Sequence, residues 1–386
     1  MISPEIQRRM VSIRRDIHQH PELGWQESRT AEKVCQTLDE LGITYLKNVG
    51  GTGVVAEIPG QRSRPFIALR ADMDALPIIE ETGLPFSSQV PGVMHACAHD
   101  GHTAMLLGAA MVLIKGEPPP LPVRLIFQPA EETALGAKRL ISEGVLKDVA
   151  MIFGGHIDRH YPCGTIIVTK GAVNASSDRF SVEIAGQGGH AARPHEAVDA
   201  VVVGSLLVIA LQTIVSREIN PAHPSVVSIG RFDAGTAGNV IAGHALLQGS
   251  IRAQDPEVRS ALHRSLRRIS ESVAQLHDAE IRVDIQQGPP PLINSDVMTT
   301  LARHAALQTV SKDRVGKLLT ANMGGEDFSY YLDHVAGCYV RYGAQIPGRE
   351  GYPAHSSRFD FDEGALSIGA AYLVNIAREA ALTIRQ

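Results

Sequence analysis

The chain has 386 residues, of which 44% are hydrophobic and 20% charged, and its formal net charge is −5. These values are typical of a soluble globular protein and argue against a disordered or fibrous chain. The mildly acidic balance argues against nucleic acid or an anionic membrane as the main partner, so we expect a small-molecule ligand.

The first part of the chain alternates predicted helices with predicted buried strands. Two opening segments carry apolar residues at helical spacing, 4–18 and 27–41, and Gly42 is placed to cap the second. Three short apolar segments bounded by Gly, Pro or charge are typical of buried strands: 53–58, 66–69 and 123–127. Helical patterns at 103–114 and 135–146 alternate with them, which predicts an α/β sheet covered on both faces.

The pattern changes at Asp178, where Phe180, Val182 and Ile184 alternate with polar residues as in a strand with one solvated face. A second domain is therefore predicted to begin there. Its predicted elements are helices at 197–215 and 256–276 and strands at 225–232, 245–251 and 281–285.

The last part of the chain resembles the first part more than the insert. Residues 288–291 predict a linker, after which helical patterns at 295–309 and 366–382 flank a strand around 338–340. We therefore predict an α/β fold with two domains. A discontinuous domain, 1–177 and 288–386, holds a mixed sheet flanked by helices, and an α+β domain, 178–287, is inserted in it.

The N-terminus, the apolar runs and the cysteines predict a cytoplasmic protein. Residues 1–15 show neither a continuous apolar core nor a small-residue cleavage site, so we expect no secretory signal. The apolar run 197–211 is too short and too closely flanked by charge to span a bilayer. The four cysteines include no CxxC pair, which fits unpaired thiols in a reducing compartment.

The densest group of potential metal ligands is the segment 95–102, which contains three histidines, a cysteine and an aspartate. Cys97 and His99 are two residues apart, so in an extended segment their side chains point the same way and can share one metal ion. Thiolate and imidazole both suit zinc-like ions. The alternative is a polar loop with a buried cysteine and scattered histidines.

Carboxylates follow two of the predicted strands. Asp72 and Asp74 lie at the carboxyl end of the strand at 66–69, the edge where open α/β sheets place their sites. Asp74 is a candidate to orient a metal-bound histidine. The alternative is a solvated strand end with a helix-capping aspartate.

Glu131 and Glu132 follow the strand at 123–127 and can take different roles. One can bind metal while the other acts as base, because a metal ion acidifies a bound water and a nearby carboxylate must accept its proton. The alternative is a surface pair opening a helix.

His156 and His355 are lone histidines at the ends of apparent strands, and they gain weight only from the other candidates.

Taken together, these segments resemble the M20 metallopeptidase family, and specifically its amidohydrolase branch of hippurate hydrolases, N-acyl amino acid amidohydrolases and plant auxin-conjugate hydrolases. The resemblance spans nearly the whole chain. It is carried by ordered motifs at 14–23, 71–77, 95–102, 131–132, 188–195, 238–241 and 324–328. Such an ordered set is more specific than any one motif.

The resemblance implies two divalent metal ions, with zinc, manganese, cobalt or nickel as candidates. It makes Cys97 the bridging ligand and Glu131 the general base. The remaining implied ligands are His99, Glu132, His156 and His355. Asp72 stands where the wider peptidase family has a histidine, and Cys97 with His99 resembles the branch's replacement for that ligand set.

The insert at 178–287 resembles the family's lid or dimerisation domain, which implies a homodimer or higher homo-oligomer. His190 matches a residue that reaches the reaction's oxyanion, often in the partner subunit's site, and Asn239 matches a companion polar residue. For His190 the alternative is a turn at a strand end. Arg252 is a candidate either to hold a substrate carboxylate or to form a structural ion pair.

Two details depart from the branch. It usually reads Cys-Gly-His where this chain has Ala98 between Cys97 and His99, and Ala98 would add strain if the backbone there needs a positive φ. The segment 156–163 is also less typical and is a candidate to shape an acyl pocket.

The expected reaction is hydrolysis of the amide bond of an N-acyl amino acid, such as an N-acetyl or N-benzoyl one, to a carboxylic acid and a free amino acid. A metal-dependent dipeptidase is the main alternative and would require a free α-amino group on its substrate. A non-catalytic ligand-binding protein would lack the base or a ligand. A zinc-stabilised structural module would need a closed four-ligand site, whereas these candidates come from dispersed strand ends.

Overall fold

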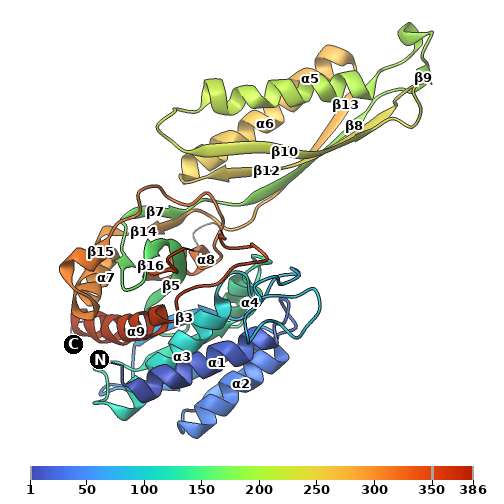
Figure 1. Ribbon diagram of the computed structural model, residues 1–386. Helices are drawn as coiled ribbons and strands as arrows, with labels where there is room; N and C mark the ends of the chain where they lie inside the picture. Colours follow the sequence, from blue (N-terminus) through green and yellow to red (C-terminus); the bar gives the residue numbers. More distant parts are fainter. Residues whose placement is uncertain (1, 349–351, 385–386) are drawn as a thin grey trace. The chain divides into compact units, whose positions relative to one another are not determined.

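The computed structural model describes residues 2–348 and 352–384, and the chain forms two compact units (Figure 1). Unit 1 comprises Met1–Gly171, Ile293–Thr320 and Asp327–Gln386, and unit 2 comprises Ala172–Leu292 and Ala321–Glu326. The chain therefore passes between the two units four times.

Unit 1 is built on a mixed sheet of eight strands in the order β1-β2-β4-β3-β5-β16-β6-β15. The strands are β1 (Tyr45–Val49), β2 (Gly53–Ile58), β3 (Phe66–Asp72), β4 (Val123–Gln128), β5 (Val149–Pro162), β6 (Ile166–Ile167), β15 (Val315–Gly316) and β16 (Ala336–Gln345). The central strand β3 runs parallel to β4 and β5, whereas β2 is antiparallel to β1 and β4. Every residue of β3 is buried, as expected for a strand covered on both faces.

Helices cover this sheet. They are α1 (Pro4–Gln19), α2 (Ser28–Glu40), α3 (His99–Lys115), α4 (Gly136–Ser142), α7 (Asp296–Thr309), α8 (Ser329–Leu332) and α9 (Gly364–Thr383). Ser3 caps α1 by accepting from the Ile6 N–H, and Gly42 follows α2 with φ +67°. Leu106 of α3 and Leu373 of α9 share one buried core with Leu69 of β3. The predicted α/β class is confirmed.

Unit 2 holds an antiparallel sheet in the order β10-β12-β8-β13. Its main elements are β8 (Asp178–Ala185), α5 (Ala200–Thr213), β10 (Ser225–Ala234), β12 (His244–Ala253), α6 (Pro256–His277) and β13 (Glu280–Gln286). Burial alternates along β8, so one face of the sheet is covered, and Figure 1 shows α5 and α6 on that face. The inserted part is therefore α+β, as predicted.

Short elements complete the described chain. They are β7 (Gly171–Asn174), β9 (Gly189–His190), β11 (Val240–Ile241), β14 (Leu292–Asn294), the 3-10 turns Pro194–Glu196 and Lys312–Arg314, and the π-helical turn Ile214–Glu218. None of these short elements was predicted as such from the sequence, because segments of two to five residues carry little periodicity.

The π-helical turn carries α5 beyond the predicted end of its helix. It extends α5 into a 19-residue helix, Ala200–Glu218, with a mean hydropathy of 1.9. By length and composition alone this helix could cross a membrane, although the run 197–211 within it is shorter than a span needs. A core helix of a soluble protein meets the same test, and Val203, Leu207 and Leu211 pack in the core of unit 2.

Candidate metal centre

The carboxyl end of β3 places Asp74 against His99, the first residue of α3. The Nδ1 atom of His99 lies 2.9 Å from the backbone oxygen of Asp74 and 3.2 Å from its Oδ1. These acceptors hold a proton on Nδ1, so Nε2 is the atom that offers a lone pair when the ring is neutral. Nε2 is buried and has no hydrogen-bond partner among the described residues. A buried imidazole nitrogen in this state is suited to a metal ion.

A left-handed turn brings Cys97 and His99 together. Ala98 has φ +67° and ψ 18°, so the extended geometry that we expected for this segment is wrong. The donor atoms of Cys97, His99 and His156 nevertheless lie within 4.8 Å of one another. Cys97 Sγ is 3.4 Å from His156 Nε2. The strain expected for alanine at a positive φ is therefore present beside these donors.

Glu132 and His355 form a second group with Cys97. The three donor atoms lie within 4.8 Å of one another, and Glu132 Oε1 is 3.4 Å from His355 Nε2. This distance is that of an ion pair without hydrogen-bond geometry, and Glu132 Oε1 has no hydrogen-bond partner among the described residues although it is buried. Like His99 Nε2, Glu132 Oε1 is therefore a buried atom without a hydrogen-bond partner among the described residues, and it lies beside the same potential metal ligands.

Two of the predicted locations were wrong in detail. His156 lies inside β5, because this strand continues well beyond the apolar run 149–153. His355 lies in a turn with φ +69°, where its N–H donates to the Ala96 oxygen at 2.8 Å. The overlapping groups still bring together all five predicted ligand side chains, Cys97, His99, Glu132, His156 and His355.

The loop that carries Glu131 and Glu132 is held by the same aspartate that contacts His99. Asp74 Oδ1 accepts the Glu131 N–H at 3.1 Å, and Oδ2 accepts the Glu132 N–H at 2.9 Å. Glu131 also lies in a group with His99 and Glu132 whose donor atoms are within 4.8 Å of one another. The contact of Asp74 with a histidine was predicted from the sequence, whereas its contacts to this loop were not.

His102 was part of the histidine-rich segment, but the protein occupies both of its nitrogens. Nδ1 lies 2.6 Å from Asp72 Oδ1, and Nε2 accepts the Ile157 N–H at 2.9 Å. Its ring centroid is 4.6 Å from that of His156. His102 therefore supports β5 beside His156, a role that its spacing in the sequence did not signal.

Burial dominates the electrostatics of these groups. It raises the pKa of the Cys97 thiol well above its ordinary value, and the Glu132 carboxylate adds to this effect. Burial also lowers the pKa of His156, with His102 and Arg341 contributing. Burial opposes protonation of His99, but Asp72 and Cys97 outweigh it and raise the pKa of His99. A metal ion that takes Cys97 as thiolate must therefore displace a proton.

Two of the candidate residues of unit 2, His190 and Asn239, lie together on its surface. His190 in β9 is paired with Val240 of β11, and the Ala191 N–H donates to the Asn239 oxygen at 3.3 Å. Both side chains are exposed, and His190 Nδ1 accepts the Ala192 N–H at 3.0 Å. Arg252 is half-buried and donates to the Met323 oxygen at 3.2 Å.

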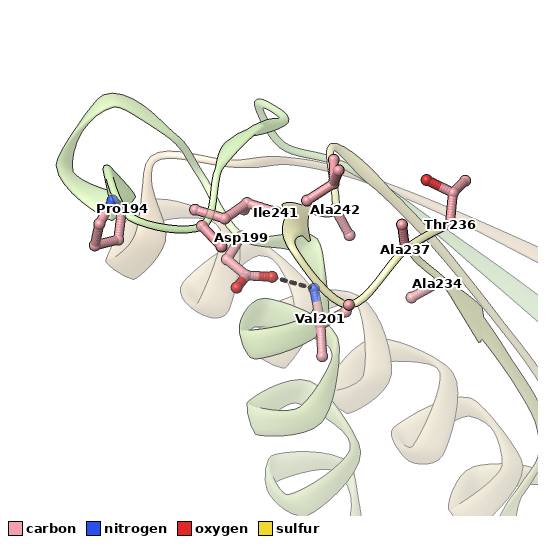
Figure 2. Close-up of a pocket in the computed structure, with 12 residues that line it drawn as sticks. Pro194, Asp199, Val201, Ala234, Thr236, Ala237, Ile241 and Ala242 are labelled. Carbon is pink, nitrogen blue, oxygen red and sulfur yellow. Dashed lines mark hydrogen bonds between the residues drawn. The ribbon is translucent and has the colours of Figure 1, made fainter.

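A cavity of about 670 Å³ is lined by chain neighbours of His190 and Asn239 (Figure 2). Its lining includes the loop 234–238 and residues that flank His190 and Asn239, namely Ala191, Gly238 and Val240. Asp199, also in the lining, caps α5 by accepting the Val201 N–H at 2.9 Å. The cavity is lined mainly by small and apolar side chains.

The fold and this set of thiolate, imidazole and carboxylate donors define a metal-dependent hydrolase. Residues 68–379 match the model of the peptidase family M20/M25/M40. The chain belongs to this family and is a metal-dependent amidohydrolase within it.

Known relatives cover nearly the whole chain. It is 40% identical over 384 residues to an N-acetylcysteine deacetylase of Bacillus subtilis, covering 96% of each protein. It is 37% identical over 382 residues to the hippurate hydrolase of Campylobacter jejuni, covering 97% of each. Its structure resembles the Bacillus subtilis YXEP protein, described as a dinuclear metal binding peptidase, with a TM-score of 0.88, 36% identity and coverage of 98% and 99%.

Proposed function

We propose that this enzyme hydrolyses the amide bond of N-acyl amino acids at a site that holds two divalent metal ions, releasing a carboxylic acid and a free amino acid. The observation that carries the proposal is the convergence of five donor side chains with the carboxylate of Glu131 in unit 1. The names of the two relatives, a deacetylase of N-acetylcysteine and a hydrolase of hippurate, support N-acyl amino acids as the substrate class.

The donor set fits the metals because it offers one thiolate, three imidazoles and one carboxylate, two of which present buried atoms without a hydrogen-bond partner among the described residues. We assign the bridging position to Cys97 and the other ligand positions to His99, Glu132, His156 and His355. When bound, the metal ions would polarise the scissile carbonyl and acidify water. Zinc, manganese, cobalt and nickel all accept these ligands.

Glu131 is the general base in this proposal. It accepts a proton from the attacking water and delivers the proton to the departing amine. Its backbone N–H is fixed by Asp74, and its Oε1 accepts the Asp327 N–H at 3.3 Å, so its carboxylate is oriented by the protein. Asp74 also fixes the His99 ring, so one carboxylate aligns a ligand and the base.

His190 and Asn239 supply polar groups for the oxyanion. Both side chains are exposed, so a substrate bound in a neighbouring subunit's site can reach them. Hydrogen-bond donors aimed at developing negative charge lower the barrier strongly in a site that excludes water. We assign residues 178–287 to a lid or dimerisation domain on this basis.

A homodimer formed through α5 would bring such a neighbour. Val201, Val202, Leu206 and Ile209 are exposed on this helix, with Ile209 67% exposed. Contiguous exposed apolar side chains of this kind mark association surfaces.

The four unpaired thiols, Cys35, Cys97, Cys163 and Cys338, support a reducing, cytoplasmic location.

The direct test is release of amino acid from N-acetyl, N-benzoyl and N-indoleacetyl amino acids beside the matching free dipeptides. Each substrate is assayed with chelated enzyme and with enzyme reconstituted with zinc, manganese, cobalt or nickel. We expect metal-dependent cleavage of the acylated substrates and none of the dipeptides. Cleavage of dipeptides alone would replace the proposal with a dipeptidase, and silence on both sets would reject the substrate class.

A further inference from the structure

Asp327 is a fully buried aspartate in the motif 324–328. Its Oδ1 accepts from Arg70 Nη2 at 2.7 Å and from Gln128 Nε2 at 2.9 Å. Its Oδ2 accepts from Gln128 Nε2 at 2.8 Å and from the Ala137 N–H at 2.9 Å. One carboxylate therefore collects hydrogen bonds from three elements of unit 1.

These partners flank the loop that carries Glu131 and Glu132. Gln128 is the last residue of β4, directly before the loop, and Ala137 is the second residue of α4, directly after it. Both ends of the loop are thus hydrogen-bonded to the carboxylate of Asp327. Its own backbone N–H donates to Glu131 Oε1 at 3.3 Å, so the same residue also contacts the carboxylate in the middle of the loop.

The loop needs such support because its backbone is unfavourable. Ala130 has φ +54° and Ala134 has φ +60°, both in the left-handed region that disfavours residues with a Cβ atom. A loop in this conformation persists only when its surroundings hold it. The hydrogen bonds that Asp74 accepts hold its centre, and those that Asp327 accepts hold its ends.

Arg70 makes the burial of Asp327 tolerable. Its guanidinium is also buried, and it donates to Asp72 Oδ2 at 2.6 Å and to Gln128 Oε1 at 2.8 Å besides Asp327. A buried carboxylate is costly unless it is paired and fully hydrogen-bonded. If the Arg70–Asp327 ion pair only stabilised the core, the Asp327 oxygens would not need to accept hydrogen bonds from both ends of the loop.

We propose that Asp327 is a positioning residue for the general base. Its peptide N–H orients the Glu131 carboxylate, and its side chain fixes the two ends of the loop that presents Glu131 and Glu132. This inference rests on the proposed role of Glu131, but the fixing of the loop by Asp327 can be measured without any turnover.

The test compares Asp327→Asn with Asp178→Asn. Asp178 is a matched control, because it is equally buried, pairs with Arg259 and accepts the Gly288 N–H at 3.0 Å, yet it lies in unit 2. Hydrogen exchange of the amides in 130–137 is measured with and without metal, together with bound metal, kcat and KM. If Asp327→Asn does not fold, Gln128→Met replaces it, because that variant removes the amide contact and keeps the Arg70 pair.

We expect the loop amides to exchange at least about tenfold faster in Asp327→Asn than in the wild type, and to be unchanged in Asp178→Asn. We expect kcat to fall about 10- to 100-fold, with KM and bound metal unchanged. Unchanged exchange, unchanged kcat, or equal loosening in Asp178→Asn would overturn the inference. Turnover by Glu131→Gln in the same series would instead reject the base assignment, while the exchange data would still decide whether Asp327 fixes the loop.

Discussion

The two regions that carry the candidate catalytic residues are built in opposite ways. In unit 1, hydrogen bonds to the buried carboxylates of Asp74 and Asp327 hold the loop with Glu131 and Glu132, and the nearby His99 is also buried. In unit 2, His190 and Asn239 are exposed on and beside strands of two residues. The donors in unit 1 are thus held in place by hydrogen bonds within that unit, whereas the His190 side chain is exposed on the surface of unit 2.

Removing the thiol of Cys97 is expected to have the largest effect. Cys97→Ser replaces the assigned bridging thiolate by a weak ligand, so bound metal should be lost and kcat/KM should fall at least about 1000-fold. Metal analysis after dialysis and an N-acyl amino acid assay check this. The control is Cys35→Ser, which changes another buried thiol and should keep metal and activity. Full metal occupancy in Cys97→Ser would remove Cys97 from the ligand set.

Removing the imidazole of His190 should cost less and should leave the metal in place. We expect His190→Ala to lower kcat about 100- to 1000-fold, as loss of an oxyanion donor does, with unchanged stability because the side chain is exposed. Steady-state kinetics, bound metal and thermal unfolding are measured on the same sample. A wild-type kcat would reject the oxyanion role.

Mixing two inactive variants tests which subunit's site His190 serves. If His190 acts in the partner's site, random pairing of His190→Ala with Glu131→Gln subunits should restore about a quarter of the wild-type activity. Half of the dimers would be mixed, and each mixed dimer would hold one intact site. No recovery after subunit exchange would mean that His190 and Glu131 of the same chain act together.

The buried carboxylate of unit 2 should affect stability and not the metal centre. Burial opposes ionisation of Asp178, but hydrogen bonds from His263 and Arg259 outweigh it and lower its pKa below the ordinary 3.8. Asp178 therefore stabilises the fold above pH 3.8, and this contribution is lost as the pH falls through the lower folded-state pKa. We expect Asp178→Asn to destabilise the protein by about 2 kcal/mol at pH 7.

Denaturant unfolding at several pH values checks this prediction. The difference in free energy of unfolding between wild type and Asp178→Asn should persist from pH 7 down to about pH 4 and shrink below it. A difference that stays constant to pH 2 would show that the charge of Asp178 is not what stabilises unit 2.

The smallest effect is expected at Ala98. Relief of the positive φ in Ala98→Gly should contribute about 1–2 kcal/mol, and the lost burial of one methyl group should cost about 0.8 kcal/mol. We therefore expect a stability change within about 1 kcal/mol, neutral or stabilising. Ala104→Gly, in the helical interior of α3, should destabilise by about 1 kcal/mol or more. Equal destabilisation by the two substitutions would mean that Ala98 is unstrained.

Much of the fold was predictable because its signals are local. The helix predicted before Gly42 and the alternation that begins at Asp178 are periodic patterns, and both elements are present. The contact between Asp74 and His99 could also be expected, since a carboxylate at a strand end commonly orients a metal-bound histidine.

The rest depends on contacts that no local pattern encodes. Arg70 and Asp327 are 257 residues apart, and Gln128 and Asp327 are 199 residues apart. The π-helical turn Ile214–Glu218 likewise carries the helix beyond its predicted end at residue 215. Long-range pairing of buried polar groups is decided by the packed structure, so the hydrogen bonds that hold the Glu131 loop became visible only there.

The most direct test of this account is the pair of measurements of bound metal and turnover in Glu131→Gln. We expect that the variant keeps its full complement of divalent metal and loses at least about 1000-fold in kcat, because the general base is removed while the ligands remain. Glu132→Gln should instead lose metal. Turnover by Glu131→Gln within about tenfold of the wild type, or loss of its metal, would contradict the assignment of Glu131 as the base.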